Sequence, residues 1–169
     1  MNIFIDYQNK ILSCIRNLAK KKIIDIPNNF KNIMVELPPK NHQADLSCNA
    51  CLVLAKSNNC SPQELAKILQ SNLLSTFSEF EKIEIAGPGF LNIFFKTSFW
   101  KKYLFKIIKL DSKYGSINGI RKKYNIEFVS ANPTGPLHVG HCRGAILGDA
   151  ISNLLIFNGN KVSKEYYVN

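Results

Sequence analysis

The stretch 124–167 constrains the fold more strongly than any other part of the chain. It begins with a run at 124–129 whose apolar residues predict a β-strand, and it continues through a turn rich in proline and glycine. A helix is then expected to run to about Phe157, followed by a second strand at 161–167. This order predicts a β-α-β unit with parallel strands. Because a parallel pair does not stand alone with both faces in water, we expect the opening of a larger α/β domain, incomplete at Asn169.

Two histidines flank a glycine at the point where this helix is expected to begin. The three residues are His138, Gly140 and His141. The first N–H groups of a helix have no partner within it and lie at the positive end of its dipole, so they attract phosphate. Imidazoles can add hydrogen bonds to phosphoryl oxygens, and a glycine lets a flat base approach the backbone. The motif therefore indicates a site for the phosphates of a nucleotide.

The net charge of the chain is +10 and comes mostly from lysine. Such an excess favours a polyanionic partner, nucleic acid first, and a lysine-rich solvated surface is an equal alternative on charge alone. Lysines recur through the segment 101–123, which is either one solvated helix face with its continuation or a patch that follows phosphates.

The five cysteines indicate reduced thiols. Their odd number and the lack of a secretory leader point to the cytoplasm, and no apolar run approaches the ~20 residues of a membrane span. Cys48 and Cys51 have the spacing of metal ligands, but the apolar residues around them favour buried thiols, so no metal site is predicted. Cys142 follows His141, yet neighbours on a helix point about 100° apart, which argues against a thiol–imidazole nucleophile.

Residues 1–112 predict a separate α+β domain. The polar, basic segment 111–123 marks its boundary with a second domain at 113–169. Ser61 and Glu64 predict a helix start with a capping box, and Asp45 is interpreted as the cap of another helix. The expected elements are helices at 7–22, 45–56, from 61 and at 98–110, and strands at 33–37, 82–86 and 90–95.

Large apolar side chains complete the expected core of this domain. Most phenylalanines of the hairpin region are expected in the core rather than as stacking platforms for bases; they are Phe77, Phe80, Phe90, Phe94 and Phe95. The last helix is expected to turn one face inward, with Trp100, Tyr103, Leu104, Ile107 and Ile108.

The residues around the histidines also carry a resemblance to a known family. His138–Val139–Gly140–His141 matches the His-x-Gly-His signature of class I aminoacyl-tRNA synthetases. The preceding segment 127–136 (E-F-V-S-A-N-P-T-G-P) resembles arginyl-tRNA synthetase in particular, and the segments 143–150 (R-G-A-I-L-G-D-A) and 166–169 (Y-Y-V-N) are similar to the same family. So is 85–92 (I-A-G-P-G-F-L-N), and the resemblance covers nearly the whole chain.

The resemblance implies a fold and a reaction. Residues 1–112 would be the family's N-terminal additional domain, which contacts the tRNA near its D-loop, and 113–169 would begin a Rossmann-type catalytic domain, truncated here. Arginine and ATP, with Mg²⁺, would give arginyl-adenylate and pyrophosphate, and the acyl group would then move to tRNA(Arg). Because the rest of the nucleotide fold is missing, the chain alone is expected to be inactive unless the C-terminal part of the enzyme is supplied.

Roles of single residues follow from the same resemblance. His138 and His141 would bind the ATP phosphates and stabilise the charge that develops during attack on the α-phosphorus, and Gly140 would admit the adenine ring. The arginine-binding residues would be Glu127, Ser130 and Asn132, with the carboxylate opposing the cationic substrate. The tRNA-binding residues would be Lys101, Lys102, Lys106 and Lys109.

Purely structural roles for these residues stay open, and so do two other functions of the chain. Ser130 and Asn132 can be turn residues that satisfy the local backbone, and Glu127 can be an outward-facing carboxylate. One alternative function is a non-catalytic tRNA-binding remnant of a synthetase. The other is a nucleotidylyltransferase, although in such enzymes the motif normally follows the first strand of the chain.

Overall fold

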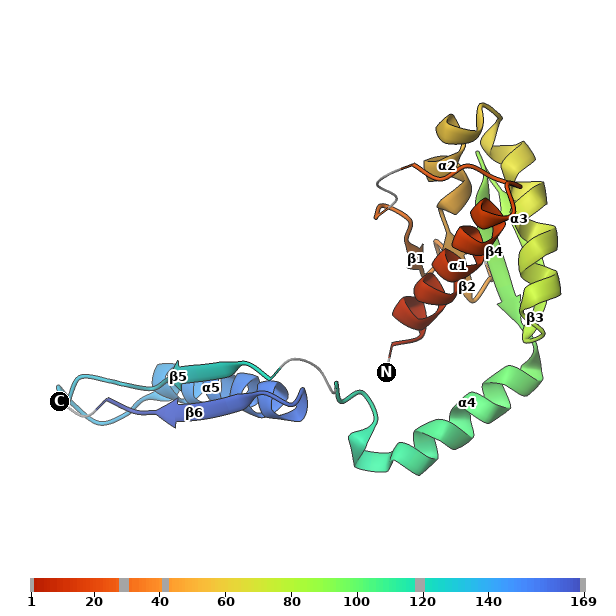
Figure 1. Ribbon diagram of the computed structural model, residues 1–169. Coiled ribbons are helices and arrows are strands. Elements are labelled where there is room, and N and C mark those ends of the chain that lie inside the picture. The colour runs from red at the N-terminus through yellow and green to blue at the C-terminus, as the bar shows by residue number, and fades with distance from the viewer. Residues whose placement is uncertain (1, 28–30, 41–42, 118–120, 168–169) are drawn as a thin grey trace. The chain divides into compact units, whose positions relative to one another are not determined.

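The structure is a computed structural model that describes residues 2–27, 31–40, 43–117 and 121–167. The chain divides into two compact units, Asn2–Asp111 and Ser112–Asn169. Their helices and strands are labelled in Figure 1.

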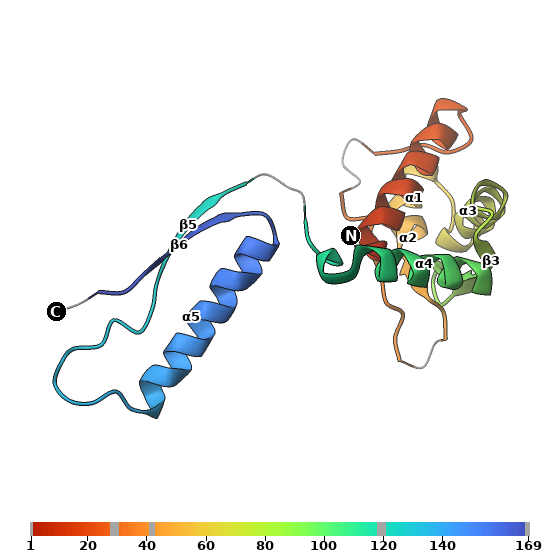
Figure 2. The same cartoon turned by 90° about the horizontal axis from the view of Figure 1, so that it is seen from below.

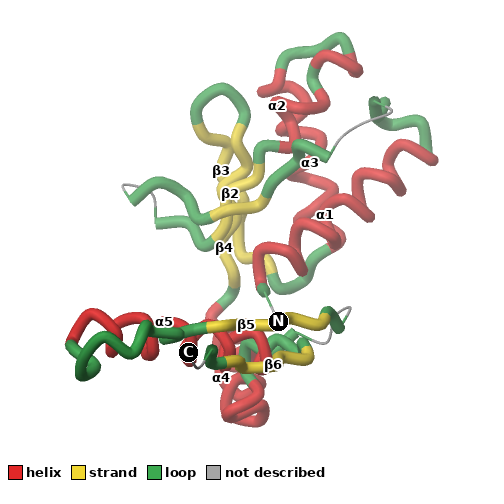
Figure 3. Tube along the Cα trace, turned by 90° about the vertical axis from the view of Figure 1, so that its left-hand side faces the viewer, coloured by secondary structure: helices red, strands yellow, loops and turns green. Residues whose placement is uncertain are grey.

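The first unit combines an antiparallel four-stranded sheet with helices. The strand order is β1-β2-β4-β3. Figure 3 shows α1, α2 and α3 on one side of the four strands. The elements are α1 (Ile3–Lys20), β1 (Val35–Glu36), β2 (Leu46–Cys48), α2 (Ala50–Leu54), η1 (Lys56–Asn58), α3 (Pro62–Thr76), β3 (Phe80–Ala86), β4 (Phe90–Phe95), α4 (Thr97–Leu110) and η2 (Asp111–Lys113).

The core of this unit lies between the sheet and the helices. Leu91 and Ile93 of β4 are fully buried against side chains such as Ile11 of α1 and Leu69 of α3. Residues alternate between the two faces of a strand, so Asn92 belongs to the opposite face. The pairing register places Glu36, Ser47, Asn92 and Glu84 in one row across that opposite face.

Local capping explains where two of the helices begin. The side chain of Asn2 accepts hydrogen bonds from the N–H groups of Phe4 and Ile5 at the start of α1. At the start of α3, the N–H of Glu64 donates to the Ser61 hydroxyl and the Ser61 N–H donates to the Glu64 carboxylate, over 3.2 and 2.9 Å. The predicted capping box is therefore confirmed.

The predicted helix at 45–56 is wrong in its first half. Residues Leu46–Cys48 form β2, which pairs with both β1 and β4, and only Ala50–Leu54 are α-helical. Asp45 caps no helix, because its carboxylate accepts a hydrogen bond from the N–H of Phe95 at 2.7 Å, 50 residues away. A strand contact that is distant in the sequence thus overrides the local capping signal.

The predicted inward face of the last helix is also wrong for its second half. None of the described side chains of α4 is buried, and Leu104 and Ile108 are 56% and 63% exposed. The first turns are anchored by rings: Phe99 stacks on Phe95 of β4 with 4.1 Å between ring centroids, and Trp100 and Tyr103 extend this cluster. In Figure 1, α4 leaves the end of β4 and extends away from the sheet.

The phenylalanines of the hairpin region divide between core and surface. Phe80 and Phe95 are buried, whereas Phe77 and Phe94 are half-buried. Phe90 is 37% exposed, so the expectation that it belongs to the core is wrong.

The second unit is the β-α-β arrangement that the sequence predicts. It consists of β5 (Lys123–Glu127), α5 (Val139–Phe157) and β6 (Lys161–Glu165), and the two strands pair in parallel. Figure 2 shows α5 alongside the strand pair. Parallel pairing brings the carboxyl ends of both strands to the edge where the loop to α5 begins.

Apolar side chains of α5 remain uncovered. Ile146 is 71% exposed and Leu154 is 60% exposed, because a two-stranded sheet covers only part of the helix surface. Among the described residues of α5, only Gly148 and Ser152 are buried. No helix in the described ranges is both long enough and apolar enough to cross a membrane.

Candidate nucleotide-binding site

The two histidines of the motif meet at the first turn of α5. His138 is the N-cap residue, and the Nδ1 atom of its ring accepts a hydrogen bond from the N–H of Gly140 at 3.2 Å. The Nδ1 atom of His141 accepts a hydrogen bond from the N–H of His138 at 3.1 Å. The ring centroids lie 3.9 Å apart. The pair thus forms a capping box built from imidazoles, where the usual side chains are hydroxyls and carboxylates.

This geometry decides which nitrogen of each ring holds the proton. A nitrogen that accepts an N–H bond has no proton of its own, so in each neutral imidazole the proton lies on Nε2. Both Nε2–H groups remain as donors beyond the capping bonds. The helix start therefore offers two side-chain donors at the positive end of the dipole, an arrangement that suits the oxygens of a phosphate.

Gly140 stands directly beside the rings. A Cβ atom at this position would lie 3.0 Å from Cε1 and 3.1 Å from Nδ1 of His138. A larger residue would therefore push on the ring that caps the helix. The packing of the His138 ring is therefore a structural reason for a glycine at this position, in addition to the expected approach of an adenine.

Glu127 ends β5 at the edge of the unit that holds the loop. It is exposed, and its register partner on β6 is Glu165. Two neighbouring carboxylates at the carboxyl ends of parallel strands repel each other and favour a cationic ligand. The sequence analysis named Glu127 and did not name Glu165, because the register partners on β5 and β6 are 38 residues apart and neither strand alone shows how the two pair.

The segment between β5 and α5 has an unusual backbone. Val129 and Ser130 have positive φ angles of 72° and 25°. The Ser130 hydroxyl accepts a hydrogen bond from the N–H of Tyr167 at 3.1 Å, which joins the loop to the chain beyond β6. Asn132 is exposed, and its carbonyl accepts the N–H of Thr134 at 2.8 Å. The Ser130 hydroxyl thus bonds a distant part of the chain, and the carbonyl of Asn132 bonds within the turn.

The cysteines of the first unit are buried thiols. Cys48 and Cys51 are fully buried, and burial raises the pKa of Cys48 to about 11 and that of Cys51 to about 12. Cys48 ends β2 and Cys51 lies in α2, so the expectation that both lie on one helix at 45–56 is wrong. Within the described ranges, no three His, Cys, Asp or Glu side chains gather in a way that could hold a metal ion. Cys142 is exposed.

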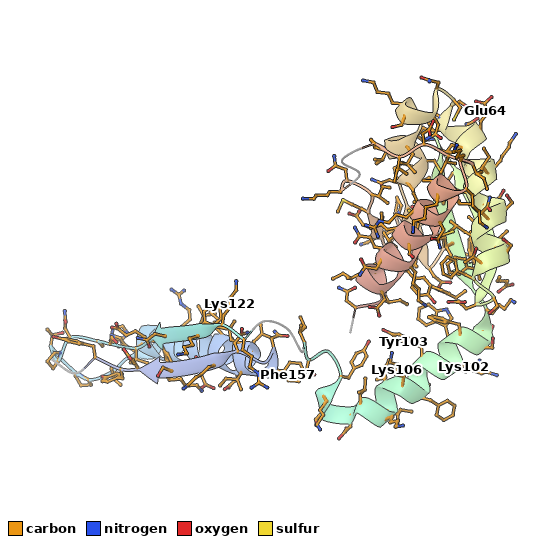
Figure 4. All side chains as sticks on the ribbon, in the orientation of Figure 1. Glu64, Lys102, Tyr103, Lys106, Lys122 and Phe157 are labelled. Atoms are coloured by element: carbon orange, nitrogen blue, oxygen red, sulfur yellow. The ribbon has the colours of Figure 1, made fainter. Side chains whose placement is uncertain are left out.

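The four lysines proposed to bind RNA lie along α4. Lys101, Lys102, Lys106 and Lys109 are all exposed, and Figure 4 labels Lys102 and Lys106. Exposed lysines on an extending helix can reach phosphates without leaving the surface of the unit.

A pocket that the sequence analysis missed opens on the sheet face opposite the helices. Its volume is about 570 Å³. Asn92 is only 4% exposed, although its side chain is polar. The ring of Phe90 lies at the rim, beside the turn that joins β3 and β4. The lining residues are Met34, Glu36, Leu37, Pro39, Ser47, Asn49, Ala86, Gly87, Phe90 and Asn92. The sequence offers one indication of this pocket, because Asn92 is the polar residue in the otherwise apolar strand β4.

Two family models match successive parts of the chain. The model described as "Arginyl tRNA synthetase N terminal domain" matches residues 6–95, and "tRNA synthetases class I (R), catalytic domain" matches residues 104–169. The chain belongs to the arginyl-tRNA synthetase family. The second match begins within α4, at the point where the ring cluster ends and the exposed apolar residues begin.

Curated relatives agree with this assignment to the family. The chain is 50% identical over 170 residues to an arginine–tRNA ligase of Pelagibacter ubique, with 100% of the chain and 30% of the relative covered. It is 42% identical over 172 residues to the ligase of Allorhizobium ampelinum, with 100% of the chain and 29% of the relative covered. The chain therefore spans about 30% of the length of these relatives.

A solved structure shares the fold. The arginyl-tRNA synthetase of Plasmodium falciparum has a TM-score of 0.67 and 20% sequence identity, with 95% of this chain and 30% of that chain covered. At this identity, the likeness supports the fold alone.

Proposed function

We propose that the chain supplies the ATP- and tRNA-binding N-terminal part of an arginine–tRNA ligase. The proposed reaction is the ATP-dependent activation of L-arginine, followed by transfer of the arginyl group to tRNA(Arg) in the cytoplasm. The observation that carries the proposal is the imidazole capping box at the start of α5, in which both Nδ1 atoms accept backbone N–H bonds. In this arrangement both Nε2–H groups are held ready for phosphate.

The two imidazoles act as positioned donors. When the carboxylate of arginine attacks the α-phosphorus of ATP, negative charge grows on the phosphoryl oxygens and on the departing pyrophosphate. Hydrogen bonds from the Nε2–H groups of His138 and His141 would stabilise that charge more than the charge of the ground state. Neither ring forms a covalent intermediate in this scheme. Mg²⁺ would arrive with the phosphates of ATP as part of the substrate.

Glu127 is proposed to bind the cationic substrate. It ends β5 beside the loop of Ser130 and Asn132, and Glu165 adds a second carboxylate at the neighbouring strand end. A carboxylate forms strong, charge-assisted hydrogen bonds with an ammonium or guanidinium group. Ser130 and Asn132 would hold the α-amino end of arginine.

The first unit is proposed to bind tRNA by two means. The lysines of α4 would follow the phosphates, and the pocket opposite the helices would accept an unstacked base. The exposed side chain of Phe90 offers a stacking surface, and the amide of Asn92 can both donate and accept, as the edge of a base requires. In this proposal 1–112 is the tRNA-recognition domain, and 113–169 begins a Rossmann-type catalytic domain.

A chimaeric enzyme tests the proposed function. These 169 residues would replace the matching part of the Pelagibacter ubique ligase, which is 50% identical to them. We expect ATP–pyrophosphate exchange that requires both arginine and tRNA(Arg). His138→Asn keeps an acceptor for the Gly140 N–H but lacks a donor at the Nε2 position, so exchange should fall about 100-fold, the cost of one lost transition-state hydrogen bond.

The outcomes separate the candidate functions. A folded chimaera that binds tRNA without exchange would favour the non-catalytic remnant. Exchange without arginine or tRNA would favour a nucleotidylyltransferase, an alternative that the family membership already disfavours. Full activity of His138→Asn would contradict the proposed role of the imidazole.

A further inference from the structure

Gly148 of α5 lies against Phe128, the residue that follows β5. A Cβ atom on Gly148 would lie 2.3, 2.5 and 2.7 Å from Cγ, Cβ and Cδ2 of Phe128. No real Cβ atom makes such contacts, and one of the three involves the Cβ of Phe128, which cannot rotate away. Gly148 is therefore required here by the close approach of Phe128.

Phe128 is the last residue before the backbone changes direction. Its N–H donates to the carbonyl of Glu165 at 3.3 Å, which extends the pairing of β5 with β6 by one residue. Directly after it, Val129 has a φ of 72° and Ser130 a φ of 25°. A β-branched residue with positive φ is sterically disfavoured, so the surrounding structure must hold it in place.

Two contacts hold this turn. On one side, the ring of Phe128 lies against Gly148. On the other side, the hydroxyl of Ser130 accepts the N–H of Tyr167 at 3.1 Å. The turn is thus fixed between the helix and the chain that follows β6.

The same face of α5 carries one of the histidines. His141 precedes Gly148 by seven residues, which is about two helical turns, so both lie on the face toward the strands. The distance between α5 and β5 at Gly148 therefore also sets where His141 stands relative to the end of β5.

We propose that Gly148 is a positioning residue, which lets Phe128 fix the left-handed turn and so directs the loop of Ser130 and Asn132 toward the histidine pair. It acts through Phe128 and does not touch a substrate. The inference rests on the proposed function for the identity of the substrates, while the positioning of the loop itself can be tested without them.

Amide hydrogen exchange of the 169-residue chain tests this positioning. Gly148→Ala should raise exchange at the Tyr167 amide and at 129–131 by about tenfold or more, because the turn loses its fixed place. Gly144→Ala is the matched control, because Gly144 lies on the same helix and a Cβ atom there would meet nothing within 4 Å. It should leave exchange at these amides within about twofold of the unchanged chain.

A second variant decides the outcome if Gly148→Ala does not fold. Phe128→Ala keeps the backbone and removes the ring that lies on Gly148, so it should raise exchange at the same amides without a clash. Ser130→Ala should raise exchange at Tyr167 and leave Phe128 protected. Wild-type exchange at Tyr167 and 129–131 in a folded Gly148→Ala or in Phe128→Ala would overturn the proposal, as would an equal rise in Gly144→Ala.

The chimaeric enzyme connects positioning with catalysis. Gly148→Ala should raise the KM for arginine about tenfold and change kcat less than about threefold, since the loop binds substrate but does no chemistry. An unchanged KM alongside raised amide exchange would overturn the link to substrate. A chimaera without any exchange activity would count against the proposed function and leave the amide-exchange result standing.

Discussion

At the scale of single residues, each ring of the histidine pair caps the start of α5, and the proposed function gives the same ring a second role as a donor to phosphate. The Nδ1 atoms of His138 and His141 satisfy backbone donors that a helix leaves unpaired, and this use fixes the protons on the Nε2 atoms. The positions of both histidines and the start of α5 could be predicted from the sequence. The exchange of caps between the two rings follows only from coordinates, because histidine is not among the common capping residues.

Substitution of His138 separates the two roles. His138→Ala removes the cap and should lower the free energy of unfolding by about 1 kcal/mol. His138→Asn should keep or raise it, because asparagine is a preferred N-cap residue. Thermal and denaturant unfolding of the chain, followed by circular dichroism, measures both. Equal stability of the two variants would show that the ring does not cap α5.

The buried thiols make stability depend on alkaline pH. An unfolded cysteine loses its proton near pH 9, whereas Cys48 holds it until about pH 11 and Cys51 until about pH 12, so the pKa of each is raised by folding. Their contribution is complete below pH 9 and is lost as the pH rises, by up to about 3 kcal/mol for Cys48. Burial and Glu79 also raise the pKa of Tyr7, which adds to the same loss.

Unfolding experiments between pH 8 and pH 11 test this dependence. Stability should decrease more steeply in the unchanged chain than in Cys48→Ala, and Cys142→Ala should behave like the unchanged chain because Cys142 is exposed. In the folded chain, iodoacetamide should modify Cys142 first and leave Cys48 and Cys51 unreacted. Equal slopes for all three proteins would contradict the assignment.

At the scale of elements, the helix starts and the β-α-β order were predictable, because their signals are local. Ser61 and Glu64 specify the start of α3 within four residues. Asp45 carries an equally local cap signal, but its partner is Phe95, and no local rule indicates β2. The pocket around Asn92 depends on the register of four strands, and the neighbour of Glu127 depends on the pairing of β5 with β6. These pairings join residues that are distant in the sequence, which is why β2, the pocket and the second carboxylate could not be predicted.

The ring cluster at the start of α4 offers a test at this scale. Trp100 is the only tryptophan of the chain and lies against Phe99, with 5.2 Å between ring centroids. Phe99→Ala should shift the emission of Trp100 to longer wavelength and increase its quenching by acrylamide, because the first turns of α4 lose their anchor. Phe105 is 72% exposed, and Phe105→Ala should change neither property. An equal response to both substitutions would contradict anchoring by the cluster.

At the scale of the whole molecule, the two units differ in how fully they bury their apolar side chains. The first unit closes a core that contains Ile11, Leu69 and Ile93, whereas α5 of the second leaves apolar side chains such as Ile146 in solvent. A fragment of residues 1–111 should therefore unfold cooperatively, with a midpoint near that of the same unit in the full chain. A gradual, non-cooperative transition of this fragment would contradict the assignment of a self-sufficient core.

The proposed binding of tRNA predicts a dependence on salt. Affinity of the chain for tRNA(Arg) should fall linearly on a plot of log K against log salt, by ~0.7–0.9 per phosphate contact. Replacing the four lysines of α4 with glutamine should reduce this slope. Replacing an equal number of exposed lysines elsewhere, at Lys20, Lys21, Lys56 and Lys67, should not. Equal slopes in the two quadruple variants would assign the binding to net charge rather than to α4.

The protonation of the two imidazoles tests the central claim most directly. A long-range proton–nitrogen NMR spectrum of the chain, recorded with both imidazoles neutral, distinguishes a protonated from an unprotonated nitrogen in each ring. We expect both His138 and His141 to hold the proton on Nε2 and to leave Nδ1 bare, as the shared cap requires. A proton on Nδ1 of either ring would contradict the cap and, with it, the paired donors on which the phosphate site depends.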